Sequence, residues 1–269
     1  MDVPQETFRK LQDLERQLLS HRPLLVAYSG GVDSMFLLAS AVRVLGTGAS
    51  GVIADSPSLP RQALDQALTA AAGFGARIHI VETDEFADPR YLTNAPDRCY
   101  FCKSELFARM DQMARERGYA ALAYGENADD PPQLRPGSQA ASEFQVLAPL
   151  KQAGLSKAEI RLLARQLNLP AADSPAQPCL ASRIPHGTRV TKEAVHLIEC
   201  GEEILRQHGF RVIRLRYLDG TPPSARLQVA PDEVACLEGL AAQIADQLRE
   251  IGFGTVEIDP LGYQGAGLL

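Results

Sequence analysis

Residues 6–167 alternate between short apolar runs and longer segments in which apolar positions recur every three or four residues. The short runs predict buried strands at 24–28, 51–54, 77–81 and 120–124. The longer segments predict helices over 6–20, 34–45, 60–73, 103–117 and 156–167. Strands and helices that alternate in this way are typical of an α/β fold, in which a parallel sheet is covered on both faces.

Local signals refine three of these segments. The first helix has one apolar face, made of Phe8, Leu11, Leu14 and Leu18. The helix over 156–167 opens with Ser156 followed three residues later by Glu159, which predicts a capping box. A stretch rich in Pro, Gly and Ser predicts a mobile loop over 131–142.

The pattern changes towards the C-terminus. After an irregular, Pro-rich stretch at 171–188, the order becomes helix, two strands, helix and strand. These elements are predicted at 192–208, 211–217, 225–229, 231–251 and 255–258. The sequence therefore predicts two domains: an α/β domain over 1–188 and a small α+β domain over 189–269.

Composition narrows the class of protein. The 269 residues are 45% hydrophobic and carry a net charge of −6, which argues against a dedicated tRNA-binding protein. The N-terminus shows no secretory signal, and no apolar run is long enough to span a bilayer. We therefore expect a cytoplasmic protein with no membrane or nucleic-acid partner, in which the five cysteines are reduced.

The turn after the first strand carries the strongest chemical signal. It reads Ser-Gly-Gly-Val-Asp-Ser and lies between a buried strand and a helix. Two glycines let backbone N–H groups converge on an anion, and the helix N-terminus favours negative charge at the same point. The predicted phosphate-binding residues are Ser29, Gly30, Gly31, Asp33 and Ser34. An ordinary tight turn is the alternative. No Gly-Lys-Ser/Thr follows, so the turn departs from a Walker A loop.

Polar residues follow two other predicted strands. Ala54, Asp55 and Ser56 come after the second strand, where they are expected to border the ribose or adenine of a nucleotide. Gly125, Asn127, Asp129 and Asp130 come after the fourth strand. Carboxylates at this position suit Mg²⁺ bound to phosphates, and an Asx-rich turn is the alternative.

The cysteines suggest a second kind of site. Cys99 and Cys102 form a Cys-x-x-Cys pair placed just before the helix predicted to start near 103, and a helix N-terminus favours the thiolate. Cys179 lies alone in the irregular stretch. If the three meet, they suit a [4Fe–4S] cluster with one open iron or an open Cys₃ zinc site. A redox pair is the alternative for the Cys-x-x-Cys, while Cys200 and Cys236 read as ordinary helix residues.

The Ser-Gly-Gly turn resembles the PP-loop of the ATP pyrophosphatase superfamily, whose members split ATP into AMP and pyrophosphate. The whole chain resembles the LarE family of sulfurtransferases within it, which serve the nickel-pincer nucleotide cofactor of lactate racemase. The resemblance rests on segments in the same order along the chain, at 29–34, 54–60, 94–103, 125–130, 135–137, 179–188 and 259–263.

That resemblance implies a Rossmann-like sheet and a reaction. A carboxylate of a pyridinium-3,5-dicarboxylate mononucleotide is adenylated by ATP and then converted to a thiocarboxylate, with Asp33 as a catalytic residue. In one form of the family the cysteine matching Cys179 gives up its own sulfur. In the other, three cysteines, here Cys99, Cys102 and Cys179, hold a [4Fe–4S] cluster recharged by sulfide or a sulfur donor, and the present chain favours this form.

The resemblance also implies binding roles for polar residues in the C-terminal half. Ser182, Arg183, Arg214 and Arg216 would bind the phosphate and carboxylates of the substrate. A solvated strand face is the alternative for Arg214 and Arg216. Where the family often has a Glu, this chain has Gln228, which puts a metal contact at that position in doubt. Homo-oligomers are also expected from the family.

Three other functions remain open at this point. A tRNA thiolation enzyme of the same superfamily would need a basic RNA-binding groove. An NAD synthetase would share the Ser-Gly-Gly-Val-Asp-Ser loop without a use for gathered cysteines. A regulator would bind ATP without turnover.

Overall fold

The computed structural model describes residues 3–130, 136–175 and 178–264, and these divide into two compact units. The first contains residues up to 88 and from 97 to 177, and the second contains 89–96 and everything from 178 onwards. The second unit therefore includes a short segment that precedes the Cys-x-x-Cys pair in the sequence. Its main part begins at Pro178, eleven residues before the predicted start at 189.

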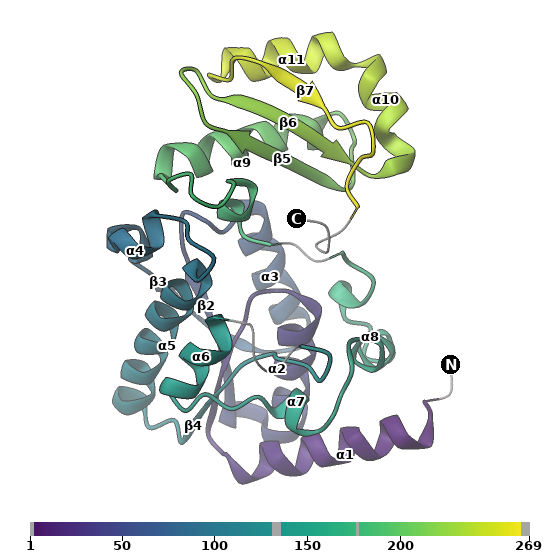
Figure 1. The fold of residues 1–269 in the computed structure, drawn as a ribbon. Coiled ribbons are helices and arrows are strands. Elements are labelled where there is room, and N and C mark those ends of the chain that lie inside the picture. Colours follow the sequence, from purple (N-terminus) through teal and green to yellow (C-terminus); the bar gives the residue numbers. More distant parts are fainter. Residues whose placement is uncertain (1–2, 131–135, 176–177, 265–269) are drawn as a thin grey trace. The chain divides into compact units, whose positions relative to one another are not determined.

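The first unit is an α/β layer structure around a four-stranded parallel sheet, as the sequence predicts (Figure 1). Its strands are β1 (Leu24–Ala27), β2 (Ala49–Asp55), β3 (Arg77–Glu82) and β4 (Ala121–Ala123), in the spatial order β3-β2-β1-β4. Its helices are α1 (Gln5–Ser20), α2 (Val32–Leu45), α3 (Arg61–Gly73), α5 (Arg98–Arg117), α6 (Pro136–Glu143), α7 (Pro149–Gln152) and α8 (Lys157–Gln166), with 3₁₀ turns η1 (Gly46–Gly48), η2 (Glu85–Ala87) and η3 (Pro170–Ala172).

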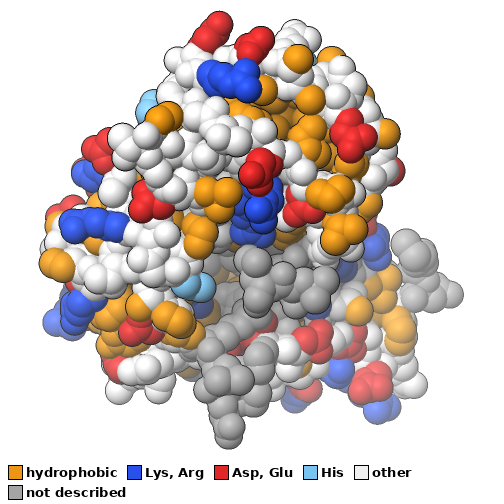
Figure 2. Space-filling view, turned by 45° about the horizontal axis from the view of Figure 1, so that its top comes forward, with side chains coloured by type: hydrophobic (Ala, Val, Ile, Leu, Met, Phe, Trp, Pro, Cys, Tyr) orange, Lys and Arg blue, Asp and Glu red, His pale blue; other side chains and the backbone are white. Residues whose placement is uncertain are grey.

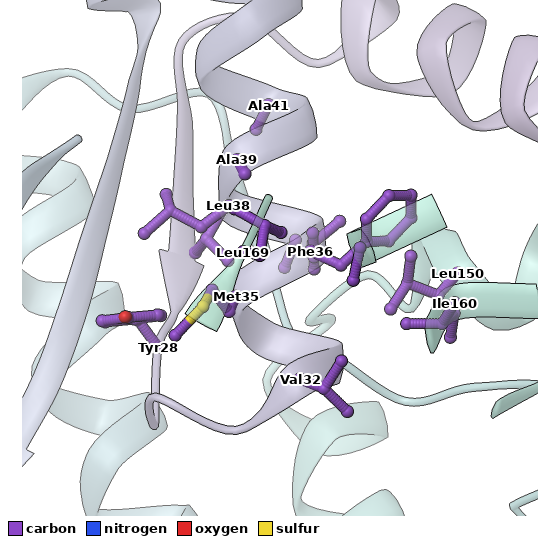
Figure 3. Close-up of a cluster of buried hydrophobic side chains, with 14 of the residues drawn as sticks. Tyr28, Val32, Met35, Phe36, Leu38, Ala39, Ala41, Leu150, Ile160 and Leu169 are labelled. Carbon is purple, nitrogen blue, oxygen red and sulfur yellow. The ribbon is translucent and has the colours of Figure 1, made fainter. Parts of the chain in front are cut away.

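Alternating side chains of β1 build a hydrophobic core on each face of this sheet. Leu24 and Val26 point into a core shared with α1, α2 and α8. Leu25 points the other way, into a core shared with α5 and α6. Figure 3 shows the first core, where Phe36 of α2 lies beside Leu150 and Ile160. Burying each such side chain contributes about 1.5–3 kcal/mol, and together they fix where the strand ends point.

The second unit is a small α+β structure. Its sheet has the order β5-β6-β7, in which β5 (Ile213–Leu218) pairs antiparallel with β6 (Ser224–Val229), and β6 pairs parallel with β7 (Val256–Ile258). Its helices are α4 (Pro89–Leu92), α9 (Lys192–Gln207), α10 (Val234–Gly239) and α11 (Ala241–Glu250), with 3₁₀ turns η4 (Leu180–Arg183) and η5 (Pro231–Glu233). None of the helices in the described parts of the chain combines the length and the apolar character needed to cross a membrane.

Four local predictions need correction. Phe8 is half exposed rather than part of the buried face of α1, where Thr7 is buried instead and donates to Glu159. Helix α5 begins at Arg98, so the Cys-x-x-Cys pair lies inside its first two turns. The helix predicted over 231–251 is interrupted after Gly239, a poor helix former.

The fourth correction concerns the predicted mobile loop. Its residues 136–142 form most of α6, because Pro136 is compatible with a first helical turn and the following small residues pack on α5. Residues 131–135 of that loop lie outside the described residues. By contrast, the capping box of Ser156 and Glu159 is confirmed, with both reciprocal hydrogen bonds present.

Candidate functional site

The Ser-Gly-Gly turn lies between β1 and α2, at the carboxyl end of the sheet (Figure 1). Gly30 has a φ of +76°, and a Cβ atom there would lie 2.8 Å from the Cβ of Ala67, so glycine is required on both counts. The hydroxyls of Ser29 and Ser34 lie 3.1 Å apart, and Ser34 also accepts from the backbone N–H of Ser29. The turn is therefore closed by its own hydroxyls, which leaves its backbone and the start of α2 facing the ligand end of the sheet.

Asp33 is held by a lysine that the sequence reasoning did not identify. The Nζ of Lys157 lies 2.5 Å from Oδ2 of Asp33. The other oxygen of Asp33, Oδ1, is buried and accepts no hydrogen bond from any described residue. A buried carboxylate oxygen without a donor is costly, so this atom is suited to a cation or a ligand hydrogen.

The segment after β4 approaches the same turn at Gly125. A Cβ atom on Gly125 would lie 2.7 Å from the backbone nitrogen of Ser34 and 3.0 Å from the carbonyl carbon of Asp33. Only a residue without a side chain permits this approach of two backbones. Gly125 therefore brings the 125–130 segment against the start of α2, as its predicted place in the site requires.

The polar residues that follow Gly125 form an Asx-type turn, the alternative that the sequence left open. Asn127 Oδ1 accepts from the backbone N–H of Asp129 at 2.9 Å, and Asp130 Oδ2 accepts from that of Asn127 at 3.1 Å. Asp129 Oδ2 also accepts from the backbone N–H of Lys157 at the start of α8, at 2.7 Å. Both aspartates also line the pocket described below, and their binding of Mg²⁺ stays a prediction.

Glu126 is a second residue that the sequence reasoning missed. Its buried carboxylate accepts hydrogen bonds from the hydroxyls of Tyr124 and Ser138 and from Nζ of Lys151 at 3.2 Å. Burial opposes the ionisation of Glu126, but these donors outweigh it and lower its pKa. The ionised carboxylate thus ties α6 and α7 to the end of β4. In the sequence, the only indication of a role for Glu126 was that it lies within the 125–130 segment.

These residues enclose a pocket of about 490 Å³ within the first unit. Its lining residues are Asp33, Lys103, Tyr124, Gly125, Glu126, Asn127, Asp129, Asp130, Ser138 and Lys157. Of the predicted phosphate-binding residues only Asp33 is among them. The lining does not include Ser29, Gly30, Gly31 or Ser34, nor Ala54, Asp55 or Ser56. Asp55 pairs with Arg61 instead, at 2.5 Å, and Ser56 donates to the buried Glu85.

The Cys-x-x-Cys helix reaches this pocket through Lys103. The Nζ of Lys103 lies 4.9 Å from the centre of the Tyr124 ring, a cation–π distance. Cys99 and Lys103 are four residues apart on α5 and so share one side of that helix. Cys99 is exposed and Cys102 is half-buried. The first unit therefore places the two thiols on a helix whose adjacent lysine lines the pocket.

Cys179 belongs to the second unit, where it precedes the turn η4. Arg183 closes this turn: its guanidinium donates to the carbonyl oxygens of Pro178 at 2.6 Å and Cys179 at 3.2 Å. The same guanidinium forms a two-point ion pair with Glu202 of α9, at 2.8 and 3.1 Å, and both side chains are buried. Arg183 is thus committed to fixing the backbone at Cys179, a role that its predicted substrate contact did not include.

Arg214 and Arg216 share one side of β5, as predicted. Arg214 lies 4.7 Å from the ring centre of Tyr263, and burial together with the nearby Arg183 lowers its pKa. Arg216 donates to the carbonyl oxygen of Ser182 at 3.0 Å and to Oε1 of Gln228 at 3.0 Å. These arginines are half or fully buried, so the alternative of a solvated strand face does not describe them.

Both polar atoms of the Gln228 side-chain amide form hydrogen bonds. The oxygen accepts from Arg216, and the nitrogen donates to Asp259 at 2.7 Å. This hydrogen bond, with smaller contributions from the Leu261 N–H and nearby arginines, lowers the pKa of Asp259. A glutamate could not donate to Asp259, so the amide suits this pair where the family often has a carboxylate.

Within the described residues, no three His, Cys, Asp or Glu side chains converge as a metal-binding group. Cys99 and Cys102 lie in one unit and Cys179 in the other. On the face drawn in Figure 2, basic and acidic side chains are interspersed rather than separated by sign. The absence of a nucleic-acid partner stays a prediction.

Comparisons with known proteins identify the family. No protein-family model matches the sequence. A Synechocystis protein named "Uncharacterized protein slr1717" is 36% identical over 261 residues, which cover 96% of both chains. The "Pyridinium-3,5-bisthiocarboxylic acid mononucleotide synthase" of Lactiplantibacillus plantarum is 29% identical over 255 residues, covering 94% of this chain and 89% of that protein. With sequence similarity along almost its whole length, the chain belongs to the LarE-like family.

Proposed function

We propose that this protein is an ATP-dependent sulfurtransferase that adenylates a carboxylate of pyridinium-3,5-dicarboxylate mononucleotide and converts it to a thiocarboxylate. The pocket between the Ser-Gly-Gly turn and the Gly125 segment carries this proposal. It combines Asp33 of the Ser-Gly-Gly turn with two lysines and several further carboxylates, in a chain whose relative is named as a pyridinium-3,5-bisthiocarboxylic acid mononucleotide synthase.

The first step is adenylation. A carboxylate oxygen of the substrate attacks the α-phosphorus of ATP, the bond to the β-phosphate oxygen breaks, and pyrophosphate leaves. Backbone N–H groups at Gly30 and Gly31 and the hydroxyls of Ser29 and Ser34 would hold the pyrophosphate. Lys157 and Lys103 would balance the charge of the phosphates within the pocket.

The carboxylate oxygens that line the pocket are suitable ligands for Mg²⁺. Asp33 contributes a buried oxygen that has no donor among the described residues, and Asp129 and Asp130 line the same space. Mg²⁺ generally keeps several waters and takes one or two protein carboxylates plus phosphate oxygens, so a closed protein cage is not required. When bound, the ion would neutralise phosphate charge.

The second step is sulfur transfer. A sulfur nucleophile attacks the activated carbonyl carbon and AMP leaves with the electrons of the broken C–O bond. Cys99, Cys102 and Cys179 would hold a [4Fe–4S] cluster, which would supply the sulfur nucleophile, with sulfide or a sulfur donor as the source of that sulfur. The alternative is that Cys179 donates its own sulfur once. One thiol of the set, that of Cys99, shares a side of α5 with the pocket-lining Lys103, which supports a role in this step.

The second unit would bind the anionic parts of the substrate. Arg214, Arg216 and Ser182 lie together there, with Arg183 holding the turn that follows Cys179. Partly buried guanidinium groups are strong partners for phosphate and carboxylate, because little water competes for them. The cytoplasmic location and the homo-oligomeric state belong to this proposal as expectations.

Pyrophosphate release tests the proposal. The purified protein is given ATP and Mg²⁺, with the pyridinium dicarboxylate mononucleotide, bulk tRNA, or nicotinate adenine dinucleotide with ammonia. Release only with the dicarboxylate is the expected result. Release only with tRNA would identify a tRNA thiolation enzyme, and release with ammonia an NAD synthetase. ATP binding with no release under any condition would identify a regulator.

A further inference from the structure

The segment 89–96 lies in the second unit, although it leads directly into the helix that carries Cys99 and Cys102. It is hydrogen-bonded to the segment that follows Cys179. The backbone N–H of Val190 donates to the carbonyl of Leu92 at 2.9 Å, and that of Gly187 donates to the carbonyl of Asn94 at 3.1 Å. Two segments about ninety residues apart, one on each side of α5 and α8 in the sequence, therefore form one hydrogen-bonded structure.

Asn94 is the centre of this structure. Its side chain is fully buried, and its Nδ2 donates to the carbonyls of Ile184 at 3.2 Å, Pro185 at 2.8 Å and Thr188 at 3.0 Å. Nδ1 of His186 lies 3.1 Å from the Asn94 carbonyl oxygen. The amide thus gathers the carbonyls of one turn around a single nitrogen.

The backbone of Asn94 has a φ of +56°, in the left-handed region. Apart from glycine, asparagine is among the residues that tolerate this conformation best. Glycine would fit the backbone but would lack the amide, and aspartate would fit the space but present a carboxylate to three carbonyl oxygens. Asparagine satisfies both requirements at this position.

The turn that Asn94 holds continues into the backbone at Cys179. Ile184 follows Arg183, whose guanidinium donates to the carbonyl of Cys179. The backbone N–H of Ser182 also donates to that carbonyl, at 2.9 Å. Asn94 fixes the end of this short segment, and Arg183 fixes its beginning, so the orientation of the Cys179 side chain depends on both.

We propose that Asn94 is a positioning residue that orients Cys179 by clasping the 184–188 turn to the segment leading into the Cys99-x-x-Cys102 helix. This inference rests on the proposed function, because it assumes that Cys179 must be oriented for sulfur transfer. Asn94 touches neither substrate nor cluster; it acts through Ile184, Pro185 and Thr188 on the turn that follows Cys179.

The test uses the full chain with Cys200 and Cys236 replaced by alanine and with no cluster loaded. Asn94→Gly removes the amide and keeps the left-handed backbone, and Asn94→Asp keeps the size and removes the donors. Asn168→Gly is the matched control, since Asn168 also has a positive φ, of 52°, but is exposed at the end of α8. Two quantities are measured on each protein. The first is the rate of backbone hydrogen exchange, and the second is the rate of cross-linking by a short bifunctional thiol reagent, with the cross-linked cysteines identified by peptide mass.

Both Asn94 variants are expected to exchange the N–H groups of Gly187 and Val190 at least tenfold faster, and to form cross-links from Cys179 to Cys99 or Cys102 at least tenfold more slowly. ATP binding and the Asn168→Gly control should match the parent. Parent-like exchange and parent-like cross-linking in both variants would overturn the proposed role of Asn94. If the parent forms no cross-link from Cys179 at all, the three-cysteine part of the proposed function fails, while the exchange rates at Gly187 and Val190 still decide the clasp.

Discussion

The ammonium of Lys157, the first residue of α8, lies 2.5 Å from a carboxylate oxygen of Asp33 in the first turn of α2. The lysine therefore neutralises a carboxylate at the point where the phosphates of ATP are proposed to bind. If phosphates and Mg²⁺ bind as proposed, Asp33 would turn to the metal ion and Lys157 to a phosphate, and neither charge would be left unpaired. The proposal therefore includes Lys157 in the nucleotide site.

Lys157→Met should therefore lower the rate of AMP formation by about ten- to a hundredfold, since a charge-assisted hydrogen bond contributes about 1.5–3 kcal/mol. The loss should appear in coupled pyrophosphate assays. Lys10→Met is the control, because Lys10 also forms an ion pair, with Glu159, outside the pocket. Equal rates for Lys157→Met and the parent protein would remove Lys157 from the site.

Gly125→Ala should abolish ATP binding. The added Cβ would lie 2.7 Å from the Ser34 nitrogen, a backbone atom that cannot move independently of the turn. We expect no measurable ATP binding by calorimetry and a lower free energy of unfolding. Gly73→Ala adds the same methyl group at the end of α3, where nothing lies within 4 Å, and should change neither quantity appreciably. Parent-like ATP affinity in Gly125→Ala would show that the two backbones need not approach so closely.

Glu202→Gln should destabilise the protein by about 3–5 kcal/mol, because it leaves the buried Arg183 guanidinium without its counter-charge. Glu203→Gln changes the neighbouring residue on α9, whose half-exposed ion pair with Arg206 contributes at most about 1 kcal/mol. Urea unfolding of the two variants measures the difference. Similar losses in both would mean that the buried pair stabilises no more than a surface pair.

Acid should weaken the contact between α1 and α8. Burial opposes ionisation of Glu159, but hydrogen bonds from Ser156, Lys10 and Thr7 outweigh it and lower its pKa to about 2. A carboxylate with a depressed pKa stabilises the fold above its unfolded pKa, near 4.5, and this contribution is lost as pH falls towards 2.

Glu159→Gln should accordingly cost about 2 kcal/mol at pH 7, and the difference from the parent should shrink steadily below pH 4.5. Unfolding by urea at a series of pH values measures it. Glu6→Gln serves as the control, because Glu6 is exposed on α1 and its pairing with Lys10 is long, at 3.8 Å. A difference between Glu159→Gln and the parent that does not change with pH would contradict this account.

The sequence predicted the parallel sheet because short apolar runs, such as that of β1, alternate with helical segments, which is typical of strands buried on both faces. It predicted the capping box of α8 because that signal is entirely local. It missed the early start of α5, where Arg-Cys-Tyr-Phe-Cys has no apolar periodicity, and the exposure of Phe8, which depends on which helices pack against α1.

The site was predictable where backbone geometry demands a residue type, as at Gly30. It was not predictable where long side chains reach across the fold. Lys157 is 124 residues from Asp33 and Asn94 is about ninety from the turn it holds, and neither spacing leaves a pattern in the sequence. Asp55 and Ser56 were assigned to the nucleotide from their strand end alone, whereas their side chains contact Arg61 and Glu85.

Counting products per chain tests the central claim most directly. Protein reconstituted without oxygen is given ATP, Mg²⁺, an excess of sulfide and the pyridinium dicarboxylate mononucleotide, and both thiocarboxylate and the intact mass of the chain are measured. Cys179→Ser is run beside it and should still adenylate the substrate and release pyrophosphate, while yielding no thiocarboxylate. The account predicts more than one thiocarboxylate per chain, with the mass unchanged. At most one per chain, with Cys179 lacking the elements of hydrogen sulfide, would contradict the cluster and show that the protein gives up its own cysteine.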